Sequence, residues 1–213
     1  MINSEEAARA WLLQHDWCGP DALERLDQLV ALLGEENERQ NLVSKPSLGA
    51  VWRRHIVDSA QLLLHVPRET PAPWLDLGTG AGFPGLVIAA LRPQMAVHMV
   101  ESRSRRADWL DRARSELGLA NAQVLGTRLE QIDSYQAGAI SARAFAPLDK
   151  LLSLSSRFST MSTIWLLPKG RSAVNELDEL GGWRHTFHVE QSLTDPDSGI
   201  IVGKLAGRKG KKT

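Results

Sequence analysis

The sequence has little of what secreted, zinc-binding or membrane proteins need. Its single cysteine, Cys18, excludes an internal disulfide and a cysteine-based zinc site, and is typical of a reducing compartment. No apolar run approaches the roughly 20 residues that a membrane-spanning helix requires. Residues 1–6 contain neither a basic nor an apolar segment, so we expect no signal peptide. These absences predict a cytoplasmic protein with no metal site and no membrane anchor.

The chain has no net charge, yet its two parts differ in their balance of basic and acidic residues. Residues 1–70 hold 7 Lys and Arg against 11 Asp and Glu, whereas residues 71–213 hold 18 against 14. The last ten residues contain five Lys or Arg and no acid. Such a segment suits a polyanion, because each cation placed on a phosphate releases counterions. A frayed, solubilising tail fits it equally well.

A chain of 213 residues is long enough for one α/β domain and an additional unit. Residues 1–67 show helical spacing of apolar side chains and a capping residue, Ser4, and predict three helices. Three prolines between positions 67 and 73 mark a boundary. We therefore divide the chain into an N-terminal helical cap (1–67), a sheet-containing domain (73–206) and a basic tail (207–213).

Short apolar stretches alternate with helical ones from Trp74 onward. Five of them are predicted strands, at 73–77, 96–100, 122–125, 138–143 and 163–167. This alternation predicts a parallel sheet with helices on both faces. Two further stretches, 183–190 and 199–205, flank a strong turn signal at 195–199 and predict an antiparallel closing hairpin. The expected fold is α/β and Rossmann-like, with a seven-stranded, mostly parallel sheet.

Four glycines follow the first predicted strand, at positions 78, 80, 82 and 85. They let the backbone turn tightly and approach a ligand with no Cβ in between, and an apolar helix follows. The dinucleotide fingerprint requires a glycine at position 83, which is Phe83 here. A smaller ligand that contains adenosine fits better, and S-adenosylmethionine is the preferred cofactor. A glycine turn that only packs the strand on the helix is the alternative.

Polar residues follow the next strands, at the edge where ligands bind in open parallel sheets. Glu101 follows the second strand and could bind both ribose hydroxyls, with an exposed helix-start acid as the alternative. Leu129 and Glu130 follow the third strand, where adenine could lie. Arg143 follows the fourth and is predicted to face the cofactor or its target, with a structural ion pair as the alternative.

Two absences narrow the reaction. No Asn-Pro-Pro-Tyr-type segment, the arrangement used on exocyclic base amines, follows the fourth strand. No cysteine lies near the predicted site to attack a pyrimidine ring. A ring nitrogen with a free lone pair, such as guanine N7, needs neither, because it attacks a sulfonium methyl without first losing a proton. Catalysis then reduces to positioning and water exclusion.

Four segments carry a family resemblance, at residues 41–44 (NLVS), 54–59 (RHIVDS), 75–85 (LDLGTGAGFPG) and 141–144 (SARA). Over roughly residues 25–205 the chain closely resembles the bacterial RsmG (GidB) methyltransferases. The resemblance implies a class I methyltransferase domain at 73–206 that transfers a methyl group from S-adenosylmethionine to N7 of a 16S rRNA guanine. On the family pattern the cofactor contacts are Gly78, Phe83, Leu129, Glu130 and Arg143, with Glu101 on the ribose. We add Gly80 from the glycine turn and take Arg143 as the catalytic residue.

The predicted RNA surface combines basic residues of the cap and of strand ends. The candidates are Lys45, Arg53, Arg54, His55, Lys169 and Arg171, together with the basic tail; ordinary surface charge is the alternative for each. His55 could instead form a buried structural pair with Asp58. The expected partner is 16S rRNA or an assembling small ribosomal subunit, and we expect a monomer. Methyl transfer to a small molecule or protein, and a nucleotide-binding module without chemistry, are the other functions considered.

Overall fold

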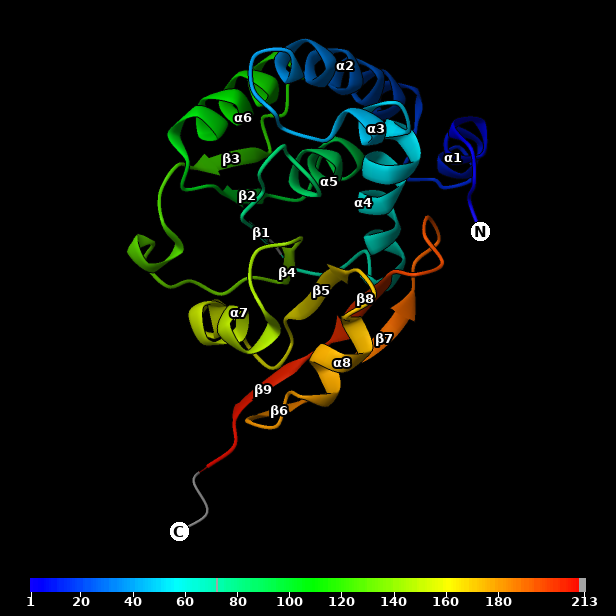
Figure 1. The fold of residues 1–213 in the computed structure, drawn as a ribbon. Coiled ribbons are helices and arrows are strands. Elements are labelled where there is room, and N and C mark those ends of the chain that lie inside the picture. Colours follow the sequence, from blue (N-terminus) through cyan, green and yellow to red (C-terminus); the bar gives the residue numbers. More distant parts are fainter. Residues whose placement is uncertain (72, 211–213) are drawn as a thin grey trace.

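The structure, a computed structural model that describes residues 1–71 and 73–210, places strands and helices after a helical N-terminal part (Figure 1). The helical part consists of α1 (Glu5–Leu12), α2 (Pro20–Asn37), α3 (Lys45–Leu48), η1 (Trp52–Val57), α4 (Asp58–Ala60) and η2 (Gln61–His65). The other helices are α5 (Gly85–Leu91), α6 (Ser104–Glu116), η3 (Leu129–Gln131), α7 (Leu148–Ser155), η4 (Ser156–Phe158) and α8 (Ala173–Asp178). The strands are β1 (Trp74–Leu77), β2 (Val97–Val100), β3 (Ala122–Leu125), β4 (Ala139–Ala142), β5 (Ile164–Lys169), β6 (Trp183–His185), β7 (His188–Gln191), β8 (Gly199–Gly203) and β9 (Leu205–Arg208).

The main sheet has seven strands in the order β3-β2-β1-β4-β5-β8-β7. Strands β1 to β5 pair in parallel, β8 is antiparallel to β5, and β7 is antiparallel to β8. The predicted sheet, mostly parallel with an antiparallel closing hairpin, is therefore confirmed. Leu77 at the end of β1 is in register with Val100 and Ala142 at the ends of its two neighbours. The strand order reverses between β1 and β4. Open α/β sheets bind ligands at the carboxyl ends of the strands beside such a point.

The last two predicted strands are each divided in the structure. The segment 183–190 contains β6 and most of β7, and the segment 199–205 contains β8 and the first residue of β9. Strands β6 and β9 form a separate two-stranded sheet. The chain bends at Gly203, with φ of 149°, where a Cβ would lie 2.7 Å from the Thr186 carbonyl oxygen. Strand β9 extends to Arg208, into the segment predicted as the basic tail, and residues 211–213 lie outside the described residues.

Apolar side chains pack on both faces of the main sheet. On one face, Trp74, Val97 and Met99 share a core with buried residues of α1, α2, η1, α5 and α6. On the opposite face, Leu75 and Ile140 pack with buried residues of α7. Figure 1 shows α7 and α5 on opposite sides of the sheet. The helical cap thus shares its core with the sheet.

The third predicted helix, over 52–64, changes its winding along its length. It begins as the π-helical η1, continues as the short α4, and ends as the 3₁₀ helix η2. The Glu5 carboxylate on α1 accepts hydrogen bonds from the Trp52 and Arg53 N–H groups, each at 3.0 Å, and so caps η1. π-Helical turns often occur at functional sites, and this one carries Arg53, Arg54 and His55.

Candidate active site

Asp76 anchors the glycine turn from within the sheet. Its fully buried carboxylate accepts hydrogen bonds from the Gly85 N–H at 3.0 Å and from the Ser141 hydroxyl at 2.7 Å. The Ser141 oxygen in turn accepts the Trp74 indole N–H at 2.8 Å. Burial raises the pKa of Asp76 to about 6. This network ties β1, β4 and the start of α5 together where the strand order reverses; the sequence signal for it is a charged residue inside an otherwise apolar strand.

Two of the turn glycines are required by close approach. A Cβ on Gly85 would lie 2.9 Å from the Asp76 carboxylate and 2.6 Å from Met99 Cγ. Gly78 has a φ of +65°, and a Cβ there would lie 2.5 Å from the Phe145 ring. A larger residue at either position would therefore displace a neighbour that lines or supports the site.

A cavity of about 400 Å³, here called the smaller cavity, opens beside the glycine turn. It is lined by Gly78, Val100, Glu101, Ser102, Arg103, Arg106, Thr127, Arg128, Leu129, Glu130, Ala144 and Phe145. Glu101 is only 5% exposed, and its carboxylate accepts the N–H groups of Gly80 at 3.1 Å and Arg103 at 2.8 Å. Four residues predicted to contact the cofactor thus lie around one cavity, after strands β1, β2 and β3: Gly78, Glu101, Leu129 and Glu130. A fifth, Gly80, is hydrogen-bonded to Glu101.

Replacing Glu101 by glutamine is expected to weaken S-adenosylhomocysteine binding by about tenfold or more, the effect of losing a charged hydrogen-bond acceptor. Isothermal titration calorimetry measures this dissociation constant. Asp108→Asn, which removes an exposed carboxylate of α6 outside the cavity lining, is the matched control. Equal affinities of Glu101→Gln and the wild type would remove Glu101 from the cofactor contacts.

A second cavity of about 880 Å³, here called the larger cavity, lies beside the first, and Ala144 and Phe145 line both. Its walls come from the cap (Ser44, Ser47, Arg54, His55, Asp58), from the segment after β4 (143–147), from the end of β5 and the start of α8 (Pro168, Lys169, Gly170, Ser172, Glu176), and from the hairpin (Ser192, Thr194, Asp195, Ser198, Gly199, Ile200). Segments distant in sequence thus meet around one cavity next to the smaller cavity.

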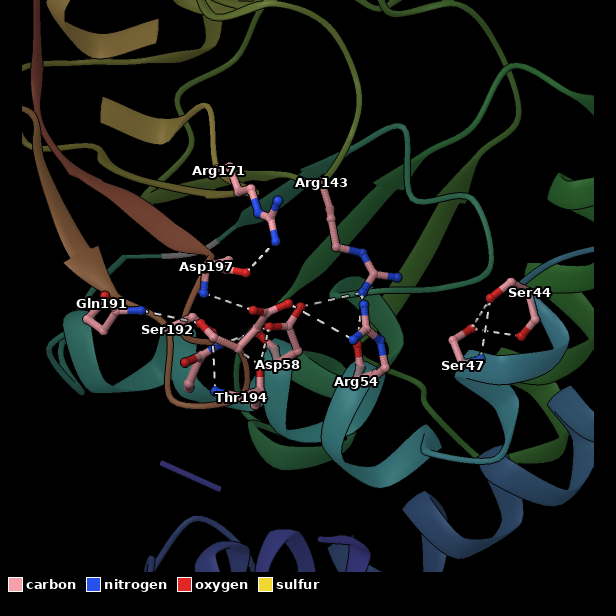
Figure 2. A network of polar contacts seen from close by, with 12 residues as sticks. Ser44, Ser47, Arg54, Asp58, Arg143, Arg171, Gln191, Ser192, Thr194 and Asp197 are labelled. Atoms are coloured by element: carbon pink, nitrogen blue, oxygen red, sulfur yellow. Dashed lines mark hydrogen bonds and ion pairs between the residues drawn. The ribbon is translucent and has the colours of Figure 1, made fainter. Parts of the chain in front are cut away.

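The hairpin turn lines the larger cavity and is hydrogen-bonded to the cap (Figure 2). The Asp58 carboxylate accepts the Thr194 hydroxyl at 2.8 Å and the Gln61 side-chain amide at 3.0 Å. Gln61 also accepts the Leu193 N–H at 2.8 Å. Burial raises the pKa of Asp58, although the charge of Arg143 acts in the opposite direction. This docking fixes the cap residues that face Arg143.

Arg143 lies in the polar network of the larger cavity (Figure 2). Its guanidinium donates to His55 Nδ1 at 3.2 Å and to the Arg54 carbonyl at 3.4 Å, and Nη1 lies 3.6 Å from the Asp58 carboxylate. The sequence left two alternatives for Arg143, a residue of the site and a structural ion pair. The structure shows features of both, because the side chain is ion-paired with Asp58 and also lines the larger cavity. Arg143 is not among the described residues that line the smaller cavity.

His55 is buried against Arg143 and stacks on Phe83, with ring centroids 4.9 Å apart. Burial, with the nearby charges of Arg143 and Arg54, lowers the pKa of His55 to about 3. The ring is therefore neutral at physiological pH and accepts the Arg143 hydrogen bond. His55 and Asp58 thus both contact the Arg143 guanidinium, which links them. Phe83 is not among the described residues that line either cavity, and its cofactor contact stays a prediction.

The predicted RNA-binding residues fall into two groups. Arg54, His55 and Lys169 line the larger cavity, whereas Lys45, Arg53 and Arg171 do not belong to its described lining. The Lys169 ammonium pairs with Glu176 at 2.7 Å, and the exposed Arg171 pairs with Asp197 at 2.6 Å. Contact with RNA stays a prediction for all six.

Two kinds of feature are absent from residues 1–71 and 73–210. No group of three or more His, Cys, Asp or Glu side chains there is placed to hold a metal ion. No helix in these residues combines the length and the apolar character needed to cross a membrane.

Comparisons with known proteins agree with one another. Residues 22–193 match the family model of rRNA small subunit methyltransferase G (GidB). The chain is 57% identical over 205 residues to the ribosomal RNA small subunit methyltransferase G of Erythrobacter litoralis, covering 96% of this chain and 98% of the relative. It is 55% identical to the protein of that name from Novosphingobium aromaticivorans, covering 99% and 98%.

Similar solved structures support the fold alone. A SAM-dependent methyltransferase from Aquifex aeolicus has a TM-score of 0.55 and 16% identity, covering 70% of this chain and 89% of its own. Aeropyrum pernix fibrillarin in complex with natively bound S-adenosyl-L-methionine has a TM-score of 0.54 and 15% identity, covering 71% and 75%.

Proposed function

Because this chain belongs to the rRNA small subunit methyltransferase G (GidB) family, we propose that it transfers the methyl group of S-adenosylmethionine to N7 of a guanine in 16S rRNA. The observation that carries the proposal is that two cavities meet at Ala144 and Phe145. One has the glycine turn and a buried carboxylate in its wall, and the other has Arg54 and Arg143 in its wall together with acidic residues that pair with cations. A methyl donor and a nucleic-acid base can thus lie next to each other.

The residues of the smaller cavity fit S-adenosylmethionine, which supplies an electrophilic methyl group bound to a positively charged sulfur. Glu101 has two carboxylate oxygens for the two ribose hydroxyls. Gly78 has no Cβ, which would lie 2.5 Å from the Phe145 ring, so Phe145 can pack against the glycine turn at the border of the two cavities. Leu129 offers an apolar surface for adenine, and Glu130 offers an acceptor for its amino group.

The larger cavity suits a guanine turned out of the RNA. It is roomy enough for a nucleotide, and Arg54 and Arg143 in its wall can bind phosphate or base oxygens. Lys45 and Arg53, on the cap outside the cavity, would extend this contact along the RNA backbone. Phe145, at the border of the two cavities, offers an aromatic face to the base.

Methyl transfer to guanine N7 needs no general base. Guanine N7 has a free lone pair, so no side chain must remove a proton before attack. The neutral His55 is already hydrogen-bonded to Arg143 and holds that guanidinium rather than taking a proton. The residues of the site therefore act by orienting the two substrates and excluding water.

The direct test is methyl transfer from tritiated S-adenosylmethionine by the purified protein. The acceptors are naked 16S rRNA and small ribosomal subunits, both from cells that lack the protein. We expect tritium in 16S rRNA, released as N7-methylguanine on hydrolysis. Label in protein, in a small molecule or at another base atom would contradict the proposal, and so would the absence of transfer to either acceptor.

A further inference from the structure

The segment between β4 and α7, residues 143–147, separates the two cavities. Its middle residues, Ala144 and Phe145, line both of them. The Phe145 ring packs against Gly78, so closely that a Cβ on that glycine would lie 2.5 Å from it. Whatever fixes this segment therefore fixes the place where the methyl donor and its acceptor meet.

The backbone in the middle of this segment does not hold its conformation by itself. Ala144 has a φ of +53°, a region that residues with a side chain rarely adopt. Such a conformation persists only where the surroundings impose it. At one end, Arg143 is bound to the cap through His55, Asp58 and the Arg54 carbonyl. The other end needs an equivalent restraint.

An ion pair between Lys169 and Glu176 supplies that restraint. The Lys169 ammonium donates to the Ala146 carbonyl at 3.2 Å and pairs with Glu176 at 2.7 Å. The same Glu176 oxygen accepts the Leu148 N–H at 3.0 Å. That N–H opens α7, which has no capping side chain of its own. The pair thus holds the backbone on both sides of Pro147.

The environment of Lys169 does not suit a phosphate contact. Its side chain is only 10% exposed, whereas that of Arg171, two residues further on, is 83% exposed. Turning the ammonium toward RNA would leave the Ala146 carbonyl and the Glu176 carboxylate without their cation. The Glu176 side chain is 23% exposed, and a largely buried charged group of this kind is costly to leave unpaired.

We propose that Lys169 and Glu176 are positioning residues for methyl transfer, which fix residues 143–148 so that Phe145 stands between the cofactor and the acceptor base. This role rests on the proposed function, because the segment matters only if the two substrates meet there. It replaces the reading of Lys169 as an RNA contact.

The test uses Lys169→Met and Glu176→Gln, singly and together, in the full-length protein. We expect each single variant to lower kcat for 16S rRNA methylation by about tenfold or more, as displaced reacting groups do. The dissociation constant of S-adenosylhomocysteine should stay within about twofold, because neither residue lines the smaller cavity. The KM for RNA should also stay within about twofold, because the two side chains, although they line the larger cavity, are paired with each other. The double variant should lose no more than the worse single one, since both act through one segment. Asp27→Asn, at the Arg9–Asp27 ion pair between α1 and α2, is the control.

Hydrogen exchange gives a readout that does not depend on activity. The peptide that covers residues 143–148 should exchange faster than in the wild type in both single variants, and at the wild-type rate in Asp27→Asn. Unchanged exchange in Lys169→Met and Glu176→Gln would overturn the proposal. Failure of the wild type to methylate rRNA would contradict the proposed function. The exchange result would still decide whether the Lys169–Glu176 pair holds residues 143–148.

The RNA-contact reading predicts a different pattern. If Lys169 binds a phosphate, Lys169→Met raises the KM for RNA, leaves kcat unchanged and lowers the slope of log affinity against log salt by about one. That result, or wild-type kcat in both single variants, would contradict the positioning role.

Discussion

Replacing Arg143 by alanine is expected to lower the rate of methyl transfer by about 100-fold, the scale of loss caused by misplaced reacting groups. The guanidinium joins β4 to the cap through His55 Nδ1, the Arg54 carbonyl and the Asp58 carboxylate. Without it, residues 143–147 lose one of their two restraints, and the larger cavity loses a cation. The measurement is kcat at saturating S-adenosylmethionine, with circular dichroism to show that the variant is folded.

Two further results decide what Arg143 does. S-adenosylhomocysteine affinity should change by no more than about twofold in Arg143→Ala, because Arg143 is outside the described lining of the smaller cavity. A tenfold weaker affinity would instead support the cofactor contact that the sequence suggested. Arg143→Lys keeps the charge but loses the planar fork of donors, so its activity should be intermediate. Wild-type turnover in Arg143→Ala would remove the residue from the site altogether.

Replacing Asp76 by alanine is expected to lower the free energy of unfolding by about 3 kcal/mol, because two buried donors lose their acceptor. These donors are the Gly85 N–H and the Ser141 hydroxyl. Urea unfolding at pH 7 measures the loss. Asp108→Ala, which removes an exposed carboxylate of α6, is the control and should leave the free energy of unfolding almost unchanged. Equal stability of Asp76→Ala and the wild type would contradict the anchoring role of Asp76.

The pH dependence of stability provides a second test of the same carboxylate. The pKa of Asp76 rises from 3.8 to about 6 on folding, so the folded state binds more protons than the unfolded state between these values. The stability that this pKa shift contributes, apart from the hydrogen bonds that Asp76 accepts, is therefore fully present below pH 4 and is lost as the pH rises through 6. His55 behaves oppositely: its pKa falls from 6.5 to about 3, and its contribution is lost on acidification.

These two slopes oppose each other in the wild type between about pH 6 and pH 4. Asp76→Asn removes one of them, so its unfolding free energy should fall more steeply than that of the wild type when the pH is lowered from 7 to 5. His55→Gln removes the other and should show the reverse. Urea unfolding at both pH values is the measurement, and parallel profiles in all three proteins would contradict the assigned pKa shifts.

Local patterns in the sequence predict the parts of the site that local geometry determines. Glycine spacing predicts the turn at 78–85, and residues after successive parallel strands lie together because their carboxyl ends share one edge of the sheet. Glu101, Leu129 and Glu130 meet around one cavity for this reason.

Contacts between distant segments leave no such pattern. The sequence does not indicate that Phe145 packs on Gly78, that Glu176 caps α7, or that the hairpin turn is hydrogen-bonded to the cap. Each of these depends on how loops from different parts of the chain pack. Asp76 is an intermediate case, because a charged residue in a buried strand must find partners, although the sequence does not name them.

The most direct measurement is the mapping of N7-methylguanine in 16S rRNA by borohydride and aniline cleavage. The RNA comes from cells in which the gene for this protein is deleted and then restored. We expect one guanine to lose its cleavage in the deletion strain, to regain it with the wild-type gene, and to regain little of it with Arg143→Ala. An identical cleavage pattern with and without the gene would contradict the account.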